Sequence, residues 1–180
     1  MKFSIPLISA FLGFVLPIFV DANSLDRFPF TVQPGVYLAT GKTQKQIQLD
    51  LTSAWGVSLI RFPKGDWQGD IYLQGILGRQ VLAGWSYGAV LGGTVWWNSQ
   101  INPDVLGLQL SGLEIRKSLM YVAKVGTESV TPSFYDIALI LNHSQFEGRE
   151  IKYGICYRLG DEVLPGVSSI QGLSFYVTWY

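Results

Sequence analysis

Apolar and polar residues alternate with a period of two along most of this chain after residue 22. In the stretch 45–61 the odd positions are mostly apolar and carry Ile47, Leu49, Leu51, Trp55, Val57 and Leu59. The even positions of the same stretch are polar or small. Successive side chains of a strand point to opposite faces, so this pattern predicts a β-strand with one apolar and one wetter face.

The alternation recurs often enough to predict an all-β domain. It is found at 80–97 and, over shorter stretches, at 71–73, 106–110, 137–141, 151–159 and 173–179. Segments rich in Gly, Pro, Asn, Asp and Ser separate these runs and are typical of chain reversals. About eight to ten short antiparallel strands are predicted, as in a sandwich or a barrel. We expect the apolar faces, with most of the tryptophans, to form the core.

The N-terminal residues predict export. A lysine precedes an apolar run over 5–20, and Val20 and Ala22 occupy the −3 and −1 positions for signal peptidase. The alternative is a transmembrane anchor, but the run contains two prolines and is shorter than the roughly 20 residues of a span. We therefore predict a signal peptide over 1–22.

Composition argues against several kinds of chemistry. The chain has 13 basic and 13 acidic residues with no basic block, so nucleic acid is not an expected partner. Cys156 is the single cysteine, which excludes an intrachain disulfide, and with His143, the single histidine, it is too little for a His/Cys metal site. Paired carboxylates fall in predicted turns. We predict no enzyme activity, no metal and no cofactor.

Two tryptophans stand apart from the apolar rows. Trp96 lies on the opposite face from Trp97, and Trp67 falls in a predicted turn region. Together they would form an exposed aromatic platform for a sugar or another protein. This favours, as one alternative, a secreted carbohydrate-binding lectin.

A small outer-membrane β-barrel is a further alternative. Alternation of large apolar with small polar residues, many glycines and a C-terminal aromatic residue are typical of such barrels. Two features argue against it. Tyr180 lies on the polar row of the last strand, and the apolar segments between 106 and 159 are short for spanning strands of 9–11 residues.

Three stretches resemble chaperone–usher fimbrial (pilin) subunits. The C-terminus 173–180, LSFYVTWY, follows a Pro-Gly turn and has a penultimate aromatic residue, Trp179. The stretch 67–75, WQGDIYLQG, is similar to the opening of enterotoxigenic-type subunits, and 130–139 is similar to a mid-domain stretch of that group.

The resemblance implies an immunoglobulin-like antiparallel sandwich over 35–180 that is incomplete and is completed by a donated strand. The implied contacts with that strand are Leu173, Phe175, Val177, Trp179 and Tyr180. The implied donor is the N-terminal extension 23–34, through Phe28, Phe30 and Val32.

The implied function is that of a minor structural or adhesive subunit of a bacterial surface fimbria, assembled by donor-strand complementation. The implied partners are a periplasmic chaperone, an outer-membrane usher and other fimbrial subunits, with a host glycan as a further ligand. The chain would pass through the periplasm and end in the fimbrium on the cell surface.

Overall fold

The structure is a computed structural model of the chain. It describes residues 28–61, 67–81, 84–97, 104–105, 108–146, 149–161, 166 and 168–179. The predicted signal peptide over 1–22 lies outside the described residues and stays a prediction.

The described residues form strands and turns, with no helix among them. Eight long strands are β1 (Phe30–Thr40), β2 (Lys45–Arg61), β3 (Trp67–Gln80), β4 (Gly84–Trp97), β7 (Gly112–Val125), β9 (Ser133–Phe146), β10 (Arg149–Asp161) and β11 (Ser169–Trp179). Three short ones are β5 (Asp104–Val105), β6 (Leu108–Gln109) and β8 (Glu128–Val130).

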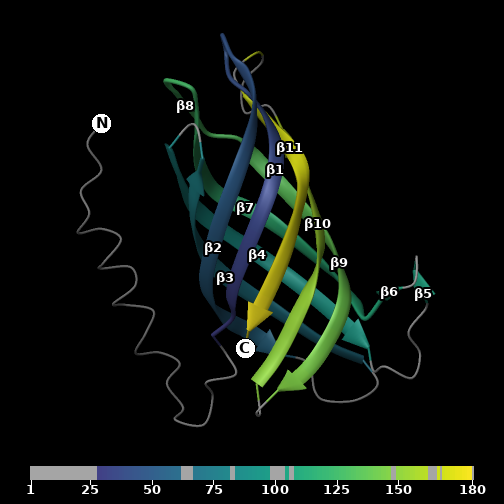
Figure 1. The fold of residues 1–180 in the computed structure, drawn as a ribbon. Coiled ribbons are helices and arrows are strands. Elements are labelled where there is room, and N and C mark those ends of the chain that lie inside the picture. The colour runs from purple at the N-terminus through teal and green to yellow at the C-terminus, as the bar shows by residue number, and fades with distance from the viewer. Residues whose placement is uncertain are drawn as a thin grey trace.

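The long strands close into a single barrel (Figure 1). Their order is β4-β3-β2-β1-β11-β10-β9-β7, and β7 pairs with β4 to complete the ring. All of these pairings are antiparallel. The N-terminal β1 and the C-terminal β11 are neighbours, so the two ends of the described chain meet in the wall. Closure leaves no free edge among the eight long strands.

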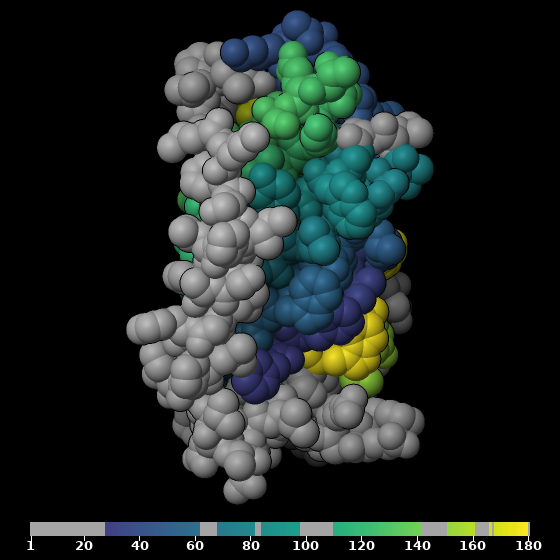
Figure 2. Space-filling view, turned by 90° about the vertical axis from the view of Figure 1, so that its left-hand side faces the viewer, coloured from purple at the N-terminus to yellow at the C-terminus, as the bar shows by residue number. Residues whose placement is uncertain are grey.

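Two hairpins extend from one end of the barrel and lie side by side (Figure 2). The turn after β1 meets β8 there, because the backbone N–H of Lys42 and the hydroxyl of Thr43 both donate to the Glu128 carboxylate, at 2.9 and 2.7 Å. Val125 and Val130, at the two sides of the β7–β8 turn, are buried in a cluster of apolar side chains, here called the upper apolar cluster, which includes Tyr37, Tyr121 and Phe134. This end of the barrel therefore holds packed apolar side chains.

The polarity of the wall is inverted relative to a water-soluble domain. Along each long strand the inward side chains are largely polar and the outward ones largely apolar. The buried polar side chains include Gln33, Gln48, Asp50, Thr52, Asp70, Gln74, Thr94, Glu114, Arg116, Asp136, Lys152, Arg158, Ser174 and Thr178. The exposed apolar side chains include Leu49, Leu51, Trp55, Leu77, Trp85, Leu91, Ile115, Leu119, Ile137, Leu173 and Phe175.

The prediction of an all-β protein is confirmed, but the predicted immunoglobulin-like sandwich is wrong. A sandwich with a missing strand needs an open groove beside the C-terminal strand. Here β11 is paired along one edge with β1 and along the other with β10. The fimbrial resemblance is wrong for the same reason, and so is the expectation of donor-strand complementation in a fimbrium.

Residues 30–34 of the segment expected to donate a strand to another subunit belong to β1, in the barrel of their own chain. β1 begins at Phe30, so the predicted boundary between an extension over 23–34 and a domain over 35–180 falls inside a strand of the wall. Phe30 and Val32 lie opposite Trp179 and Val177 of β11. The chain therefore supplies intramolecularly the pairing that had been expected between subunits.

Candidate functional site: the polar interior of the barrel

The centre of the barrel holds a carboxylate clamped between two arginines. Arg158 on β10 donates Nε to Oδ1 of Asp136 at 2.7 Å and Nη2 to Oδ2 at 2.9 Å. Arg116 on β7 approaches Oδ2 of the same carboxylate at 3.0 Å. All three side chains are almost fully buried. Such bidentate pairs join strands with defined geometry, so the triad fixes the register of β7, β9 and β10.

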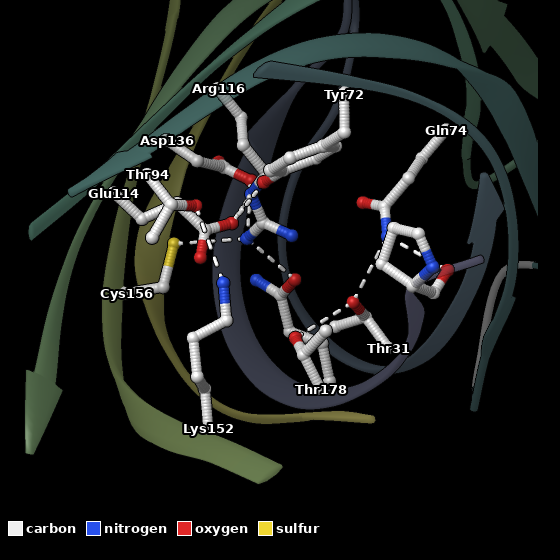
Figure 3. A network of polar contacts seen from close by, with 12 residues as sticks. Thr31, Tyr72, Gln74, Thr94, Glu114, Arg116, Asp136, Lys152, Cys156 and Thr178 are labelled. Carbon is white, nitrogen blue, oxygen red and sulfur yellow. Dashed lines mark hydrogen bonds and ion pairs between the residues drawn. The ribbon is translucent and has the colours of Figure 1, made fainter. Parts of the chain in front are cut away.

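Arg116 extends the network from Asp136 toward β1, the first strand of the barrel (Figure 3). Its Nη2 donates to Oε1 of Gln33 at 2.8 Å and to Sγ of Cys156 at 3.4 Å, while its Nε lies 3.6 Å from Oε1 of Glu114. The hydroxyl of Tyr72 donates to the same Glu114 oxygen. One guanidinium thus connects β1, β7 and β10 across the interior.

A second set of neutral hydrogen bonds lies beside this network. Gln33 donates to Ser174 at 2.6 Å, and the hydroxyls of Thr31 and Thr178 lie 2.9 Å apart, so both contacts tie β1 to β11. Gln74 on β3 donates to the Thr31 hydroxyl at 3.2 Å. The seam at which the chain closes on itself is therefore held from the inside by polar contacts.

Trp96 lies inside the barrel, so it does not form the exposed platform that was expected. It is 1% exposed, and its Nε1 donates to Gln68 at 3.1 Å. The ammonium of Lys152 lies 4.7 Å from its ring centroid and 3.4 Å from the hydroxyl of Thr94. Trp67 is opposite Trp97 in the β3–β4 register, and its side chain lies outside the described residues.

Aromatic rings surround the upper arginine of the triad. The Arg158 guanidinium lies 3.8 Å from the ring centroid of Phe134, 5.1 Å from that of Tyr37 and 5.4 Å from that of Tyr121. These rings belong to the upper apolar cluster. A barrel of about eight strands is just wide enough for side chains to fill it, and this interior is filled in that way.

The predicted groove residues lie on the outer surface instead. Leu173 and Phe175 are 58% and 64% exposed, and Val177 and Trp179 are half-buried on the same outward row. Tyr180 lies outside the described residues. Of the predicted donor residues, Phe28 is exposed, and Phe30 and Val32 are half-buried on the outward face of the wall.

Cations on the outer face are covered by aromatic rings. The Lys117 ammonium lies 3.6 Å from the ring centroid of Tyr135 and donates to the Ser133 hydroxyl at 2.8 Å. The Arg79 guanidinium lies 5.0 Å from the ring centroid of Trp85. An outward cation that is partnered in this way is tolerated next to apolar surroundings.

The remaining chemical candidates do not assemble into a reaction centre. Cys156 is buried and contacts Arg116, and the side chain of His143 lies outside the described part of the chain. Within the described ranges, His, Cys, Asp and Glu side chains form no group of three or more that would hold a metal ion. The absence of enzyme activity and of a cofactor stays a prediction.

An apolar outer wall around a closed, polar barrel defines the class of the protein. In a bilayer every backbone polar group has to be satisfied internally, which closed barrels achieve, and lipid-facing side chains alternate with polar inward ones. The fold and its interior support the alternative reading, a small outer-membrane β-barrel and thus an exported protein of the cell envelope, over the fimbrial subunit. In the described part of the chain, no helix is long and apolar enough to cross a membrane.

Comparison with solved structures finds proteins of similar fold. The chain is similar to the crystal structure of Neisserial surface protein A (NspA), with a TM-score of 0.44 and 11% sequence identity over 84% of this chain and 95% of that one. No protein-family model matches the chain. No curated protein matches it either.

Sequence reasoning did not identify the interior network. Lys152 and Arg158 stand at the polar positions of the predicted strand 151–159, which were interpreted as its wetter face, whereas Glu114 and Arg116 lie in β7, which was not predicted. The charged residues on the polar face of the strands could have indicated this network. Arg116, Asp136, Lys152 and Arg158 are charged residues placed mid-strand in phase with small or polar neighbours, which is unusual for a solvated sandwich face and expected for a barrel interior.

Proposed function

We propose that this chain is an outer-membrane β-barrel that crosses the bilayer with an occluded interior and serves as a structural or anchoring component of the envelope. The observation that carries the proposal is the inverted polarity of the wall. Leu173, Phe175 and their outward neighbours are exposed, whereas Arg116, Asp136 and Arg158 are buried.

The dimensions of the strands support a bilayer-spanning role. β7, β9 and β10 have 14, 14 and 13 residues, which exceeds the 9–11 residues that a tilted transmembrane strand needs. The outward row of β11 is apolar from Leu173 to Trp179. A continuous apolar exterior of this kind is stable in lipid and prone to association in water.

The charged interior supports an occluded rather than a conducting barrel. A channel requires a continuous polar path, and here the arginine–carboxylate triad crosses the middle while Val125 and Val130 are buried at one end. Both oxygens of the Asp136 carboxylate are bound by arginine side chains, so the three side chains are held in place across the interior.

The proposal is tested by expressing the full chain in a bacterium and fractionating the envelope. We expect the protein in the outer-membrane fraction, extractable only with detergent, and migrating faster on SDS gels before boiling than after it. Recovery as a detergent-independent soluble protein in the periplasm or medium would overturn the membrane assignment.

Occlusion is tested separately in planar bilayers. The purified, folded barrel is expected to give no steady conductance above the lipid background. A matched variant, Asp136→Ala, removes the anion that holds both arginines, and it tests whether the triad closes the interior. Steady conductance of the unmodified protein would contradict occlusion while leaving the membrane assignment intact.

The partners implied by the fimbrial resemblance, namely a periplasmic chaperone, an usher, other fimbrial subunits and a host glycan, remain untested, as does the absence of a nucleic-acid partner. The barrel fold contradicts the fimbrial resemblance, from which most of these partners were inferred.

A further inference from the structure

Two cations interrupt the apolar outer wall of the barrel. Lys117 stands in the outward row of β7 between Ile115 and Leu119, which are both exposed. Arg79 stands on the outward face of β3, two residues beyond the exposed Leu77. A charged side chain on a lipid-facing surface is costly, so its presence points to a function that compensates the charge.

Neither cation is neutralised by a carboxylate in the described part of the chain. The Lys117 ammonium donates to the Ser133 hydroxyl at 2.8 Å and lies 3.6 Å from the ring centroid of Tyr135. The Arg79 guanidinium lies 5.0 Å from the ring centroid of Trp85. The ion pairs between described residues include neither of the two. A hydroxyl and a ring orient a cation but leave N–H donors available, since an ammonium carries three of them and a guanidinium five.

Both cationic groups lie toward the end of the barrel that carries β8 (Figure 1). β8 pairs with the last residues of β7, and β3 ends at the same end because both strands are antiparallel to β4. Arg79 is the next-to-last residue of β3. The Lys117 side chain reaches Ser133, which is the first residue of β9 and therefore lies toward this end as well.

The described side chains on the outside of this end are basic. Lys45 begins β2 and Lys124 is the next-to-last residue of β7, and both are exposed. The carboxylates whose side chains are described lie buried in the interior, except that of Glu128. Glu128 already accepts hydrogen bonds from the backbone of Lys42 and the hydroxyl of Thr43. The described outer surface near β8 is therefore complementary to an anion.

Apolar rows continue from Lys117 toward the opposite end of the barrel. Ile115 and Leu113 follow on β7, and in the register they lie opposite Ile137 and Leu139 of β9. All four side chains are exposed. An oriented cation above a continuous apolar surface matches an amphiphile that has an anionic head and a hydrocarbon tail.

We propose that Arg79 and Lys117, each held against an aromatic ring, bind the phosphate groups of anionic phospholipids whose acyl chains lie on the apolar wall. The inference rests on the proposed function, since it requires the wall to face lipid. Arginine and lysine donate charge-assisted hydrogen bonds to phosphate oxygens. A basic residue near a membrane surface favours an anionic headgroup by about fivefold in affinity.

The test is native mass spectrometry of the full, folded chain released from detergent micelles. Phosphatidylglycerol and phosphatidylcholine with identical acyl chains are added at equal concentrations, so that the two arms differ in headgroup charge. Glycerol 3-phosphate, which has a phosphate and no acyl chain, forms a third arm. We expect more adducts with phosphatidylglycerol than with phosphatidylcholine and none with glycerol 3-phosphate. Adducts with glycerol 3-phosphate as abundant as those with phosphatidylglycerol would overturn a lipid as the ligand.

Three variants locate the contacts. Arg79→Gln and Lys117→Gln are each expected to lower the preference for phosphatidylglycerol, by about fivefold per cation, and the double variant to abolish it. The matched control is Lys124→Gln, which removes an exposed charge from the same strand as Lys117 and is expected to retain the preference. Faster migration on SDS gels before boiling verifies that each variant is folded.

Equal binding of the two phospholipids by the unmodified protein would overturn the proposal. So would an equal loss of preference in Lys124→Gln and Lys117→Gln, because total charge would then attract the lipid. A protein that resides in the outer membrane without this preference refutes the lipid sites alone. Recovery as a detergent-independent soluble protein refutes the proposed function itself.

Discussion

The rings of Phe30 and Trp179 stack across the seam where the chain closes, with centroids 5.7 Å apart and an interplanar angle of 26°. The first residue of β1 thereby meets the last residue of β11. The Trp55 ring lies on the other side of Phe30, at 5.5 Å. This aromatic row reinforces from the outside the seam that the Thr31 and Thr178 hydroxyls hold from within.

Removing the stacked indole is expected to weaken closure. Trp179→Ala removes an aromatic contact of about 0.5–1.5 kcal/mol in addition to the buried area. We expect a lower urea midpoint, measured by the loss of the fast-migrating folded band. The matched control is Trp85→Ala, which removes an outward tryptophan on β4, away from the seam. Equal losses in the two variants would show that the seam contact has no special weight.

Breaking the central triad is expected to have the largest effect on stability. Asp136→Asn leaves Arg158 and Arg116 buried without their shared anion, and breaking a buried pair in this way costs about 3–5 kcal/mol. Equilibrium unfolding in urea from detergent or lipid measures the change. Ser58→Ala, which removes a single buried hydrogen bond to Asp70, serves as a milder comparison. A loss for Asp136→Asn no greater than that of Ser58→Ala would contradict the central role of the triad.

A charge on the outer wall is expected to oppose membrane insertion. Phe175→Arg places a cation on a side chain that is 64% exposed on the apolar row of β11. On the lipid face this costs about 2–4 kcal/mol near the bilayer midplane. Folding yield into phospholipid vesicles should fall, while Phe175→Leu should fold as the unmodified chain does. Unchanged folding of the arginine variant would place Phe175 outside the hydrocarbon region.

An inward glycine makes room for Tyr72. Gly92 is opposite Tyr72 in the β3–β4 register, and a Cβ atom at Gly92 would lie 2.2 Å from the nearest atom of the tyrosine ring. Gly92→Val should displace the ring from Glu114 and destabilise the barrel by about 1–3 kcal/mol, as overpacking does. The unfolding midpoint in urea measures it.

The neighbouring position supplies the control for this prediction. A Cβ atom at Gly93 would meet no heavy atom within 4 Å. Gly93→Ala is therefore expected to leave the midpoint nearly unchanged. If both substitutions proved equally tolerated, the tyrosine would not depend on the space at Gly92.

Most of the strands were predictable because alternation is a local property. The run at 45–61 matches β2, and the runs at 80–97, 151–159 and 173–179 fall largely within β4, β10 and β11. The strand β7 was not predicted. Lys117 interrupts its outward apolar row, and an irregular register opposite Ala89 and Val90 leaves both Leu119 and Met120 exposed, which breaks the period of two.

The position of Tyr180 led to a wrong prediction about the barrel. The barrel was disfavoured because Tyr180 lies on the polar row of the C-terminal strand. The outward row of β11 carries Leu173, Phe175, Val177 and Trp179, so the strand presents an apolar face to the outside whatever its final residue does. The apolar segments 137–141 and 151–159, which were judged too short, belong to β9 and β10, strands of 14 and 13 residues whose inward side chains are polar.

The sequence by itself determined that the chain is built of strands with two chemically distinct faces. Extended backbone geometry requires only that neighbouring side chains point in opposite directions. Which face is inside is not a local property, because it depends on whether water or lipid surrounds the barrel. The tertiary structure decided this through closure of β1 on β11 and of β4 on β7, which encloses the charged face around Asp136 and turns the apolar face outward.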